Sequence, residues 1–393
     1  MEAFSFERAR ACVLERARCT PAIEETALLE AAGRVLAESV TADRDYPPLA
    51  RSVRDGFAVR AADLPGQLRV IGEVRAGEPA EMEVHSGEAV EIMTGAPMPR
   101  GADAVVMVEH TSAGGGRITT ERSHRAGDNV NPRASEARAG QILLAPGKRL
   151  GFPEIALLAM LGRPVVRVYR RPQVAIVPTG DEVVEIEKRP SDFQVRNSNA
   201  YSLAAQVQRA GGCPRMLPVA KDLYESTREL VERGLECDLL LLSGGVSAGK
   251  YDLVERVLGD LGAEFFFDRV LIQPGQPLVF GRARGTLFFG LPGNPASTMV
   301  TYEVFGRSAQ ELLEGQAEAP LPIAWGRLTK DFRQKPGLTR FLPALLGGDG
   351  ELTPTGWSGS GDIPALARAN AFLMTEPDRE SWSAGEMIRV LPR

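Results

Sequence analysis

Two glycine-rich loops are the segments of this chain best suited to hold an anion. The first is Ser243-Gly244-Gly245-Val246-Ser247-Ala248-Gly249, which follows an apolar run and precedes a helix-like segment. Glycines let backbone N–H groups approach an oxyanion, and a helix amino terminus adds partial positive charge. The second loop, Gly290-Leu291-Pro292-Gly293-Asn294-Pro295, repeats this arrangement one strand later. Together they predict a two-sided cradle for a phosphorylated molecule.

Each loop also has a simpler explanation. The first can be a tight strand-to-helix turn, and Asn294 can serve only as a helix N-cap followed by proline. Neither loop matches GxGxxG or GxxxxGK[ST], so a dinucleotide site and a P-loop are both disfavoured.

Carboxylates follow the same predicted strand ends. The turn Pro178-Thr179-Gly180-Asp181-Glu182 ends one strand, Asp222 opens the next helix, and Asp252 follows the first glycine loop. Carboxylates at one rim are suitable ligands for Mg²⁺ bridging to phosphate oxygens. The pattern alone leaves Asp222 and Asp252 equally well explained as helix caps or as charges that favour a helix dipole. By themselves, Asp55 and Thr94 are typical of ordinary turns in a different region.

An alternation of strands and helices positions these segments. Such alternation predicts a mostly parallel, doubly wound α/β sheet, in which ligands bind at the carboxyl ends of the strands. A capping box of Asp222 and Glu225 is expected to open one of the helices. Strands are predicted over 173–178, 215–220, 238–243, 265–272 and 286–291, and helices over 199–210, from 222, over 251–261 and after 294–295.

The rest of the chain does not alternate strands with helices. Amphipathic helices are predicted over 4–18, 22–40 and 151–162, and short β-like runs with Gly/Pro turns fill the region between them. Strand-like runs near the carboxyl terminus indicate a small β domain. The expected domains are a helical/linker domain (1–40 and 141–170), an inserted β-rich domain (41–140), the α/β domain (171–316) and a C-terminal β domain (317–393).

Composition excludes several function classes. The net charge of −5 and an aromatic content of 6% argue against nucleic-acid binding and against attraction to anionic membranes. Four cysteines without CxxC spacing and three histidines without ligand spacing argue against a zinc site and suit a reducing cytosol. The charged amino terminus does not fit a signal peptide, and no apolar run approaches the 18 residues of a membrane span. We therefore expect a cytoplasmic protein.

Seven segments follow one another along the chain: DGFAVR (55–60), IMTGAP (92–97), PTGDEV (178–183), NSN (197–199), SGGVSAGKYD (243–252), PGQP (274–277) and GLPGNP (290–295). In this order they resemble the molybdopterin molybdenumtransferase family, whose relatives include the carboxy-terminal domain of gephyrin. The resemblance implies an elongated, four-domain homodimer with its active site at the subunit interface. It also implies the reaction: Mg²⁺-dependent hydrolysis of adenylyl-molybdopterin, insertion of molybdate into the dithiolene and release of AMP. A molybdopterin adenylyltransferase is a possible partner.

The resemblance also assigns roles. Asp222 and Asp252 are the metal-linked acidic residues and, with the active-site carboxylate Glu182, form the expected metal set. Thr94 is a substrate-side hydroxyl, and Asp55 reaches in from the partner subunit. The remaining catalytic position, Glu136, stands where the family usually has aspartate. The expected substrate-binding residues are Asn197, Ser243, Gly244, Gly245, Ser247, Gly249, Lys250, Arg269, Gln273, Gln276, Pro292, Gly293, Asn294, Arg340 and Ser360.

The chain departs from the family at its expected molybdate pocket. The family usually has K-P-G-K-P where this chain has Gln273-Pro274-Gly275-Gln276-Pro277, and Pro343 replaces an arginine. Arg269 keeps a positive charge at the other basic position. A charge-assisted contact is worth about 1.5–3 kcal/mol, so the loss of two basic side chains would weaken oxyanion binding unless other cations compensate. From their placement in the sequence, we hypothesise that Lys250 and Arg340 supply the missing charge. Normal molybdate affinity in a Lys250→Ala, Arg340→Ala double variant would count against this.

Three other functions stay open at this point. The chain could be a molybdopterin carrier or scaffold without turnover, an insertase that prefers tungstate, or, leaving the resemblance aside, a generic Rossmann-like nucleotide enzyme. The retained acidic set favours catalysis, because a protein that only binds a polyanion gains nothing from carboxylates facing it. That set is Asp55, Glu182, Asp222 and Asp252.

Overall fold

The computed structural model describes residues 2–245 and 253–393, which form two compact units. Unit 1 comprises Met1–Ala37, Pro146–Ala159 and Arg163–Arg393, and unit 2 comprises Glu38–Ala145 and Met160–Gly162. None of the helices in the described ranges is both long and apolar enough to cross a membrane.

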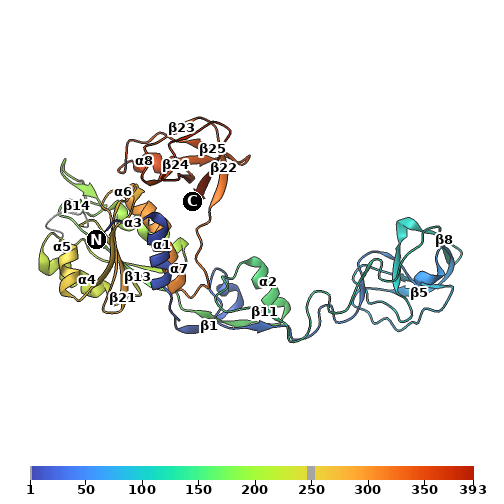
Figure 1. Cartoon of the computed structure of the whole chain (residues 1–393). Helices are drawn as coiled ribbons and strands as arrows, with labels where there is room; N and C mark the ends of the chain where they lie inside the picture. The colour runs from blue at the N-terminus through green and yellow to red at the C-terminus, as the bar shows by residue number, and fades with distance from the viewer. Residues whose placement is uncertain (1, 246–252) are drawn as a thin grey trace. The chain divides into compact units, whose positions relative to one another are not determined.

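A six-stranded sheet with the order β16-β13-β17-β21-β20-β18 lies at the centre of the α/β part of unit 1 (Figure 1). The first four strands run parallel, β20 runs antiparallel to its neighbours β21 and β18, and β18 therefore has the direction of the first four. This confirms the expected mostly parallel sheet, although β20 has no counterpart among the strands that the sequence predicts. The strands are β13 (Gln173–Pro178), β16 (Cys213–Met216), β17 (Leu239–Ser243), β18 (Glu264–Arg269), β20 (Pro277–Ala283) and β21 (Thr286–Leu291).

Helices cover both faces of this sheet, as expected for a doubly wound fold. Val174 and Ile176 of β13 face a core shared with α1, α3, α6 and α7, whereas Ala175 and Val177 face α4 and α5. Successive residues of a strand point to opposite faces, so an uninterrupted apolar strand serves both cores. The helices are α1 (Phe6–Arg16), α3 (Ser198–Arg209), α4 (Tyr224–Gly234), α5 (Leu253–Asp260), α6 (Pro295–Thr301) and α7 (Arg307–Leu313), the last two joined by the π-helical turn η4 (Tyr302–Gly306).

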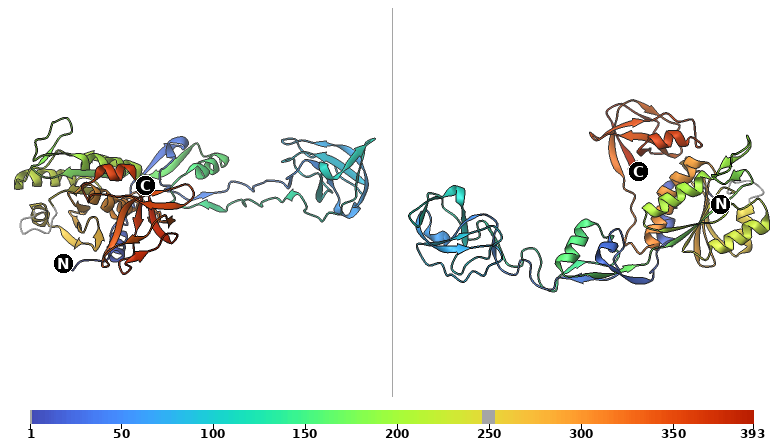
Figure 2. Two further views of the ribbon diagram at one scale, coloured as in Figure 1. Left: turned by 90° about the horizontal axis from the view of Figure 1, so that it is seen from above. Right: turned by 180° about the vertical axis from the view of Figure 1, so that it is seen from behind.

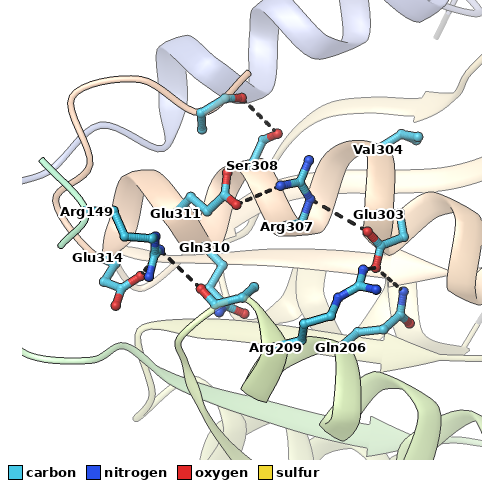
Figure 3. A network of polar contacts seen from close by, with 12 residues as sticks. Arg149, Gln206, Arg209, Glu303, Val304, Arg307, Ser308, Gln310, Glu311 and Glu314 are labelled. Atoms are coloured by element: carbon cyan, nitrogen blue, oxygen red, sulfur yellow. Dashed lines mark hydrogen bonds and ion pairs between the residues drawn. The ribbon is translucent and has the colours of Figure 1, made fainter. Parts of the chain in front are cut away.

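A network of charged side chains holds the α6-η4-α7 segment against its neighbours (Figure 3). Glu303 accepts hydrogen bonds from Arg209 at 2.5 Å and from Gln206 at 2.7 Å. The fully buried Glu314 pairs with Arg149 at 2.5 Å, and burial raises the pKa of the Glu314 carboxyl despite this partner. The segment that follows the second glycine loop is therefore fixed from both sides.

The helix predicted over 22–40 is wrong. Strand β1 (Ile23–Ala27) and the 3₁₀ turn η1 (Leu28–Ala31) occupy the start of this stretch, and β2 (Val40–Thr41) ends it. β1 pairs antiparallel with β12 (Val165–Tyr169), from Ile23 opposite Tyr169 to Ala27 opposite Val165. A partner strand so far along the chain overrides the local helical periodicity. The other two predicted helices exist as α1 and α2 (Phe152–Met160).

The C-terminal part of unit 1 is a small β-barrel, which confirms the predicted β domain. Its strands follow the order β24-β25-β22-β28-β26, and a further pairing of β24 with β26 closes the ring. β19 (Ile272–Gln273) of the α/β part joins the outer side of β24. Short β23 (Phe332–Arg333) and β27 (Ser381–Trp382) and helix α8 (Ile363–Arg368) complete it. The barrel strands are β22 (Ala324–Leu328), β24 (Thr339–Leu346), β25 (Glu351–Pro354), β26 (Ala371–Met374) and β28 (Met387–Pro392).

Unit 2 is rich in β structure and is drawn from blue to cyan in both views of Figure 2. Its main sheet has the order β7-β4-β6-β5-β9-β8, with apolar side chains buried on both faces. Two small pairs, β3 (Arg51–Ser52) with β10 (Val130–Asn131) and β2 with β11 (Ile142–Leu144), lie outside this sheet. The main strands are β4 (Gly56–Val59), β5 (Gly66–Val74), β6 (Glu88–Ile92), β7 (Ala104–Met107), β8 (Ser112–Gly114) and β9 (Arg117–Thr120).

Candidate active site

The carboxyl ends of three parallel strands meet at one edge of the α/β sheet. Pro178 of β13 stands opposite Ser243 of β17, which in turn stands opposite Leu291 of β21. Beyond these ends, the Thr179 N–H donates to the Ser243 carbonyl at 3.0 Å, and the Gly244 N–H donates to the Leu291 carbonyl at 3.1 Å. The three predicted loops therefore begin side by side, as the parallel topology requires.

The first glycine loop can be built only with glycine where it leaves β17. Gly244 has φ +97° and Gly245 has φ +64°, which are left-handed conformations that disfavour other residues. A Cβ on Gly244 would lie 2.8 Å from the Thr179 carbonyl oxygen. At Gly293, by contrast, a Cβ would meet one atom of the described residues within 4 Å, the Gly244 Cα at 3.6 Å. The two glycine loops are thus in direct backbone contact.

Asn199 joins the two loops, and it is absent from the binding residues that the sequence predicts. Its Nδ2 donates to Ser243 Oγ at 2.9 Å and to the Gly293 carbonyl at 2.8 Å. Its buried Oδ1 has no hydrogen-bond partner among the residues that the structure describes. The neighbouring Asn197, which was predicted instead, caps α3 by accepting from the Ala200 N–H at 3.2 Å.

These loops line a cavity of about 820 Å³, here called the large cavity. Its size is within the range of small-molecule sites. Residues of the C-terminal domain, Gly361 and Ile363, also contribute to its wall. The predicted residues that the large cavity brings together are Glu182, Asn197, Ser243, Gly244, Gly245, Pro292, Gly293 and Asn294. The predicted Ser247, Gly249, Lys250 and Asp252 lie outside the described residues.

The predicted carboxylates are arranged on two adjacent loops. Glu182 lines the large cavity, and its carboxylate fills the space left by Gly180, where a Cβ would lie 2.5 Å from Oε2. Asp222 does not line the cavity, but its N–H donates to Asp181 Oδ1 at 3.3 Å. The Asp181 carboxylate therefore contacts the backbone of Asp222, in the loop next to its own.

The capping box predicted for Asp222 is wrong. Helix α4 begins at Tyr224, its N-cap is Leu223, and no side chain caps it. Asp222 therefore lies before the helix, in the loop that follows β16. Likewise, Asn294 stands at the N-cap position of α6 but makes no capping hydrogen bond through its side chain.

A second cavity of about 440 Å³, here called the small cavity, adjoins the first. Pro277, Pro292 and Asn294 line both cavities. The predicted Gln273, Gln276 and Ser360 line the small cavity, and the Ser360 carbonyl accepts from the Ala296 N–H at 2.8 Å. The sequence prediction that these residues share one site with the glycine loops is consistent with this geometry.

Neither Arg340 nor Arg269 lines either cavity, but Arg340 contacts a residue that does. Arg340 Nε donates to Gln273 Oε1 at 2.7 Å, directly behind the small cavity. Partial burial lowers the pKa of the Arg340 guanidinium, which nevertheless stays charged at neutral pH. Arg269 is exposed at the end of β18, where its carbonyl accepts from the Phe4 N–H at 2.9 Å.

The remaining predicted residues, Asp55, Thr94 and Glu136, make two separate sets of contacts within unit 2. The Thr94 N–H donates to Asp55 Oδ1 at 2.7 Å, and this bond lowers the pKa of the Asp55 carboxyl. Glu136 pairs with Arg51 and accepts from Asn131 Nδ2 at 3.0 Å. The antiparallel pairing of Arg51 with Asn131 brings both of these side chains to Glu136.

Comparisons with known proteins cover nearly the whole chain. Three family models match in sequence order: the MoeA N-terminal region (domain I and II) at residues 4–162, a probable molybdopterin binding domain at 175–312, and the MoeA C-terminal region (domain IV) at 326–392. A solved structure of the molybdopterin biosynthesis MoeA protein from Pyrococcus horikoshii has a TM-score of 0.82 at 27% identity, with both chains covered completely. Another solved structure of a molybdopterin biosynthesis MoeA protein from Pyrococcus horikoshii has a TM-score of 0.74 at 31% identity, and the match covers 100% of this chain and 99% of that one.

Curated relatives give the same result. A molybdopterin molybdenumtransferase of Bacillus subtilis is 37% identical over 386 residues, which is 94% of this chain and 89% of the relative. A molybdopterin molybdenumtransferase of Staphylococcus epidermidis is 33% identical over 373 residues, which is 92% of this chain and 89% of the relative. With matches of this identity across nearly its whole length, the chain belongs to the molybdopterin molybdenumtransferase family of enzymes.

Proposed function

We propose that this enzyme inserts molybdenum into molybdopterin, using adenylyl-molybdopterin and molybdate as substrates and releasing AMP. Water cleaves the phosphoanhydride P–O bond to give AMP and molybdopterin phosphate. The two dithiolene sulfurs become bonded to molybdenum as one molybdate oxygen leaves as water with the two thiol protons, so no oxidant or reductant is needed. The relatives' name supports molybdenum insertion, and the adenylylated substrate is our extension of it.

The observation that carries this proposal is the pair of adjoining cavities. The large cavity has the glycine loops on one wall and is big enough for an extended organic phosphate. The small cavity is lined by amide and hydroxyl side chains, which suit a compact oxyanion. Because Pro277, Pro292 and Asn294 belong to both linings, the two substrates would meet there.

Asn199 supports the same assignment from the protein side. A buried acceptor without a hydrogen bond costs about 1–3 kcal/mol. The Asn199 Oδ1 is such an acceptor in a residue that lines the large cavity. A ligand N–H or O–H donor at this point would recover that cost, while the Nδ2 of the same side chain keeps the two loops together.

The described carboxylates fit a Mg²⁺ ion. Mg²⁺ prefers oxygen ligands and usually keeps several waters, so it needs only one or two protein carboxylates. Glu182, Asp181 and Asp222 supply such oxygens on adjacent loops, although no three potential ligand side chains form a metal cluster among the described residues. Bound Mg²⁺ would neutralise phosphate charge. Asp252 is the further ligand that the family resemblance implies.

We further propose that the enzyme acts as a homodimer in which Asp55 of one subunit serves the cavity of the other. Within unit 2, the bond from the Thr94 N–H keeps the Asp55 carboxylate ionised and fixes its direction. Glu136 is oriented by Arg51 in the same unit. A molybdopterin adenylyltransferase, as the source of the substrate, is a proposed partner.

The proposal is tested by measuring AMP release from adenylyl-molybdopterin with Mg²⁺, in the presence and absence of molybdate. We expect molybdate-stimulated release that is lost in Glu182→Gln and retained in Glu185→Gln, an exposed carboxylate of the same loop region that does not line the cavity. Binding of the substrate without turnover would instead indicate a carrier. Stimulation by tungstate but not by molybdate would indicate a tungstate enzyme.

A further inference from the structure

The small cavity has no charged side chain among the described residues that line it. Its polar lining consists of Gln273, Gln276, Asn294, Ser297 and Ser360. Amides and hydroxyls can donate hydrogen bonds to an oxyanion, but they cannot neutralise its charge. A cavity of this kind needs a cation close behind its wall to hold a dianion well.

Arg340 is such a cation. Strand β24 runs parallel to β19, with Arg340 directly opposite Gln273. Its guanidinium donates to Gln273 Oε1 at 2.7 Å, to Gln334 Oε1 at 3.0 Å and to the Lys335 carbonyl. All three acceptors are uncharged, and no ion pair between described residues involves Arg340, so its positive charge is not neutralised by a carboxylate.

The contact also fixes which way the Gln273 amide faces. An arginine can only donate hydrogen bonds, so the atom turned toward it must be the amide oxygen. The Gln273 Nε2 group is then left to donate elsewhere, and the residue lines the small cavity. An amide whose oxygen is bound to a cation is polarised and becomes a stronger donor at its nitrogen.

We propose that Arg340 is a positioning residue that sets the oxyanion affinity of the small cavity through Gln273. Arg340 orients and polarises the Gln273 amide. It also provides positive charge close to the small cavity, because it contacts a residue that lines the cavity without lining it itself. This inference rests on the proposed function, in which the oxyanion is molybdate. It gives a defined contact to Arg340, one of the two residues in the hypothesis made from the sequence, whereas Lys250 lies outside the described residues.

The test is isothermal titration calorimetry of the full-length protein with sodium molybdate. We expect Arg340→Ala to weaken binding by about 10- to 100-fold, the size of a lost charge-assisted contact. Arg340→Lys should recover part of this, because it keeps the charge without the planar donor group. In an Arg340→Ala background, Gln273→Lys should restore affinity by placing a cation in the cavity wall itself.

Two controls separate this role from a structural one. Gln334→Ala removes another contact of Arg340 without touching Gln273, and Arg327→Ala removes an exposed arginine of β22. Both should keep the molybdate affinity within about twofold of wild type, because neither side chain lines the small cavity. Equal weakening by Gln334→Ala and Arg340→Ala would mean that Arg340 only anchors its loop, and would overturn the inference.

A double-variant comparison tests the route through Gln273. If Arg340 acts through that side chain, Arg340→Ala should have a much smaller effect in a Gln273→Ala background than in the wild type. Unchanged molybdate affinity in Arg340→Ala, or no molybdate binding by the wild type at millimolar concentration, would overturn the inference. The proposed function fails separately, if the wild type neither binds adenylyl-molybdopterin nor releases AMP from it.

Discussion

At the start of α3, one amide nitrogen of Asn199 donates to both glycine loops. The sequence contains this residue in its Asn197-Ser198-Asn199 segment, but spacing does not tell which asparagine caps the helix and which one reaches the loops. The answer depends on the direction of each side chain at the first helical turn. Such directions follow from the packing of α3 against the sheet, which a local pattern does not contain.

Replacing Asn199 should loosen the loops and weaken substrate binding. We expect Asn199→Ala to lower the unfolding free energy by about 1–3 kcal/mol, since two hydrogen bonds are lost, and to raise the Kd for adenylyl-molybdopterin. Asn197→Ala is the matched comparison: it removes a helix cap and should lower stability by about 1 kcal/mol with a smaller change in Kd. Urea unfolding and fluorescence titration measure the two quantities. Equal changes in Kd would contradict the role given to Asn199.

The Asp55 carboxylate should contribute to stability in a pH-dependent way. The bond from the Thr94 N–H lowers its pKa in the folded protein. A lowered folded-state pKa means that the contribution is fully present above the unfolded value of about 3.9 and is lost as the pH falls through the folded value. The urea midpoint of Asp55→Asn should therefore lie below that of the wild type at pH 7, and the difference should shrink in acid. Glu121→Gln, an exposed carboxylate of unit 2, is the control.

On the scale of elements, the first glycine loop depends on backbone conformation more than on side chains. We expect Gly244→Ala to destabilise the protein by about 1–3 kcal/mol, because it combines a left-handed conformation with a Cβ 2.8 Å from the Thr179 carbonyl oxygen. Gly293→Ala should be much milder, because its Cβ would make an ordinary contact at 3.6 Å. Thermal unfolding compares the two variants. If Gly293→Ala were as unstable as Gly244→Ala, the contact between the two glycine loops, rather than backbone strain at Gly244, would account for most of the loss of stability.

The strands of the α/β sheet were predictable because they carry their own signal. A run such as Leu239–Ser243 is apolar on both faces and too short for a helix, so it fits a buried parallel strand. The segment after Pro21 carries a misleading signal instead. Its helical periodicity is real, yet β1 forms there because β12 offers an unpaired edge, and local propensity is weaker than a ladder of backbone hydrogen bonds.

At the scale of the whole molecule, the proposed active site needs residues from both units. Glu182 belongs to unit 1 and Asp55 to unit 2. If Asp55 serves the partner subunit, Asp55→Asn and Glu182→Gln should each be inactive alone. An equal mixture of the two, after subunit exchange, should regain about a quarter of wild-type activity, because half of the dimers are mixed and each has one intact site.

The measurement is molybdate-dependent AMP release before and after a cycle of mild denaturation and refolding of the mixed variants. Two copies of the same variant, treated in the same way, are the control for non-specific recovery. No regained activity in the mixture, with dimers present by light scattering, would mean that Asp55 and Glu182 act within one subunit.

The sequence by itself determined the family, the α/β class and the loops at the strand ends. These features are local: glycines, prolines and carboxylates at short spacing after apolar runs carry their meaning in a few residues. The parallel topology then requires the loops after β13, β17 and β21 to lie at one edge. For this reason Glu182, Ser243 and Asn294 were correctly expected near one another.

Only the tertiary structure decided which side chains act together across long distances in the chain. Arg340 meets Gln273 because a barrel strand of the C-terminal domain pairs with β19. Asn199 reaches two loops because α3 packs beside both, and the Asp222 N–H meets the Asp181 carboxylate because β13 and β16 are parallel neighbours. None of these contacts has a signature in spacing, since each depends on which surfaces the folded chain brings within a few ångströms.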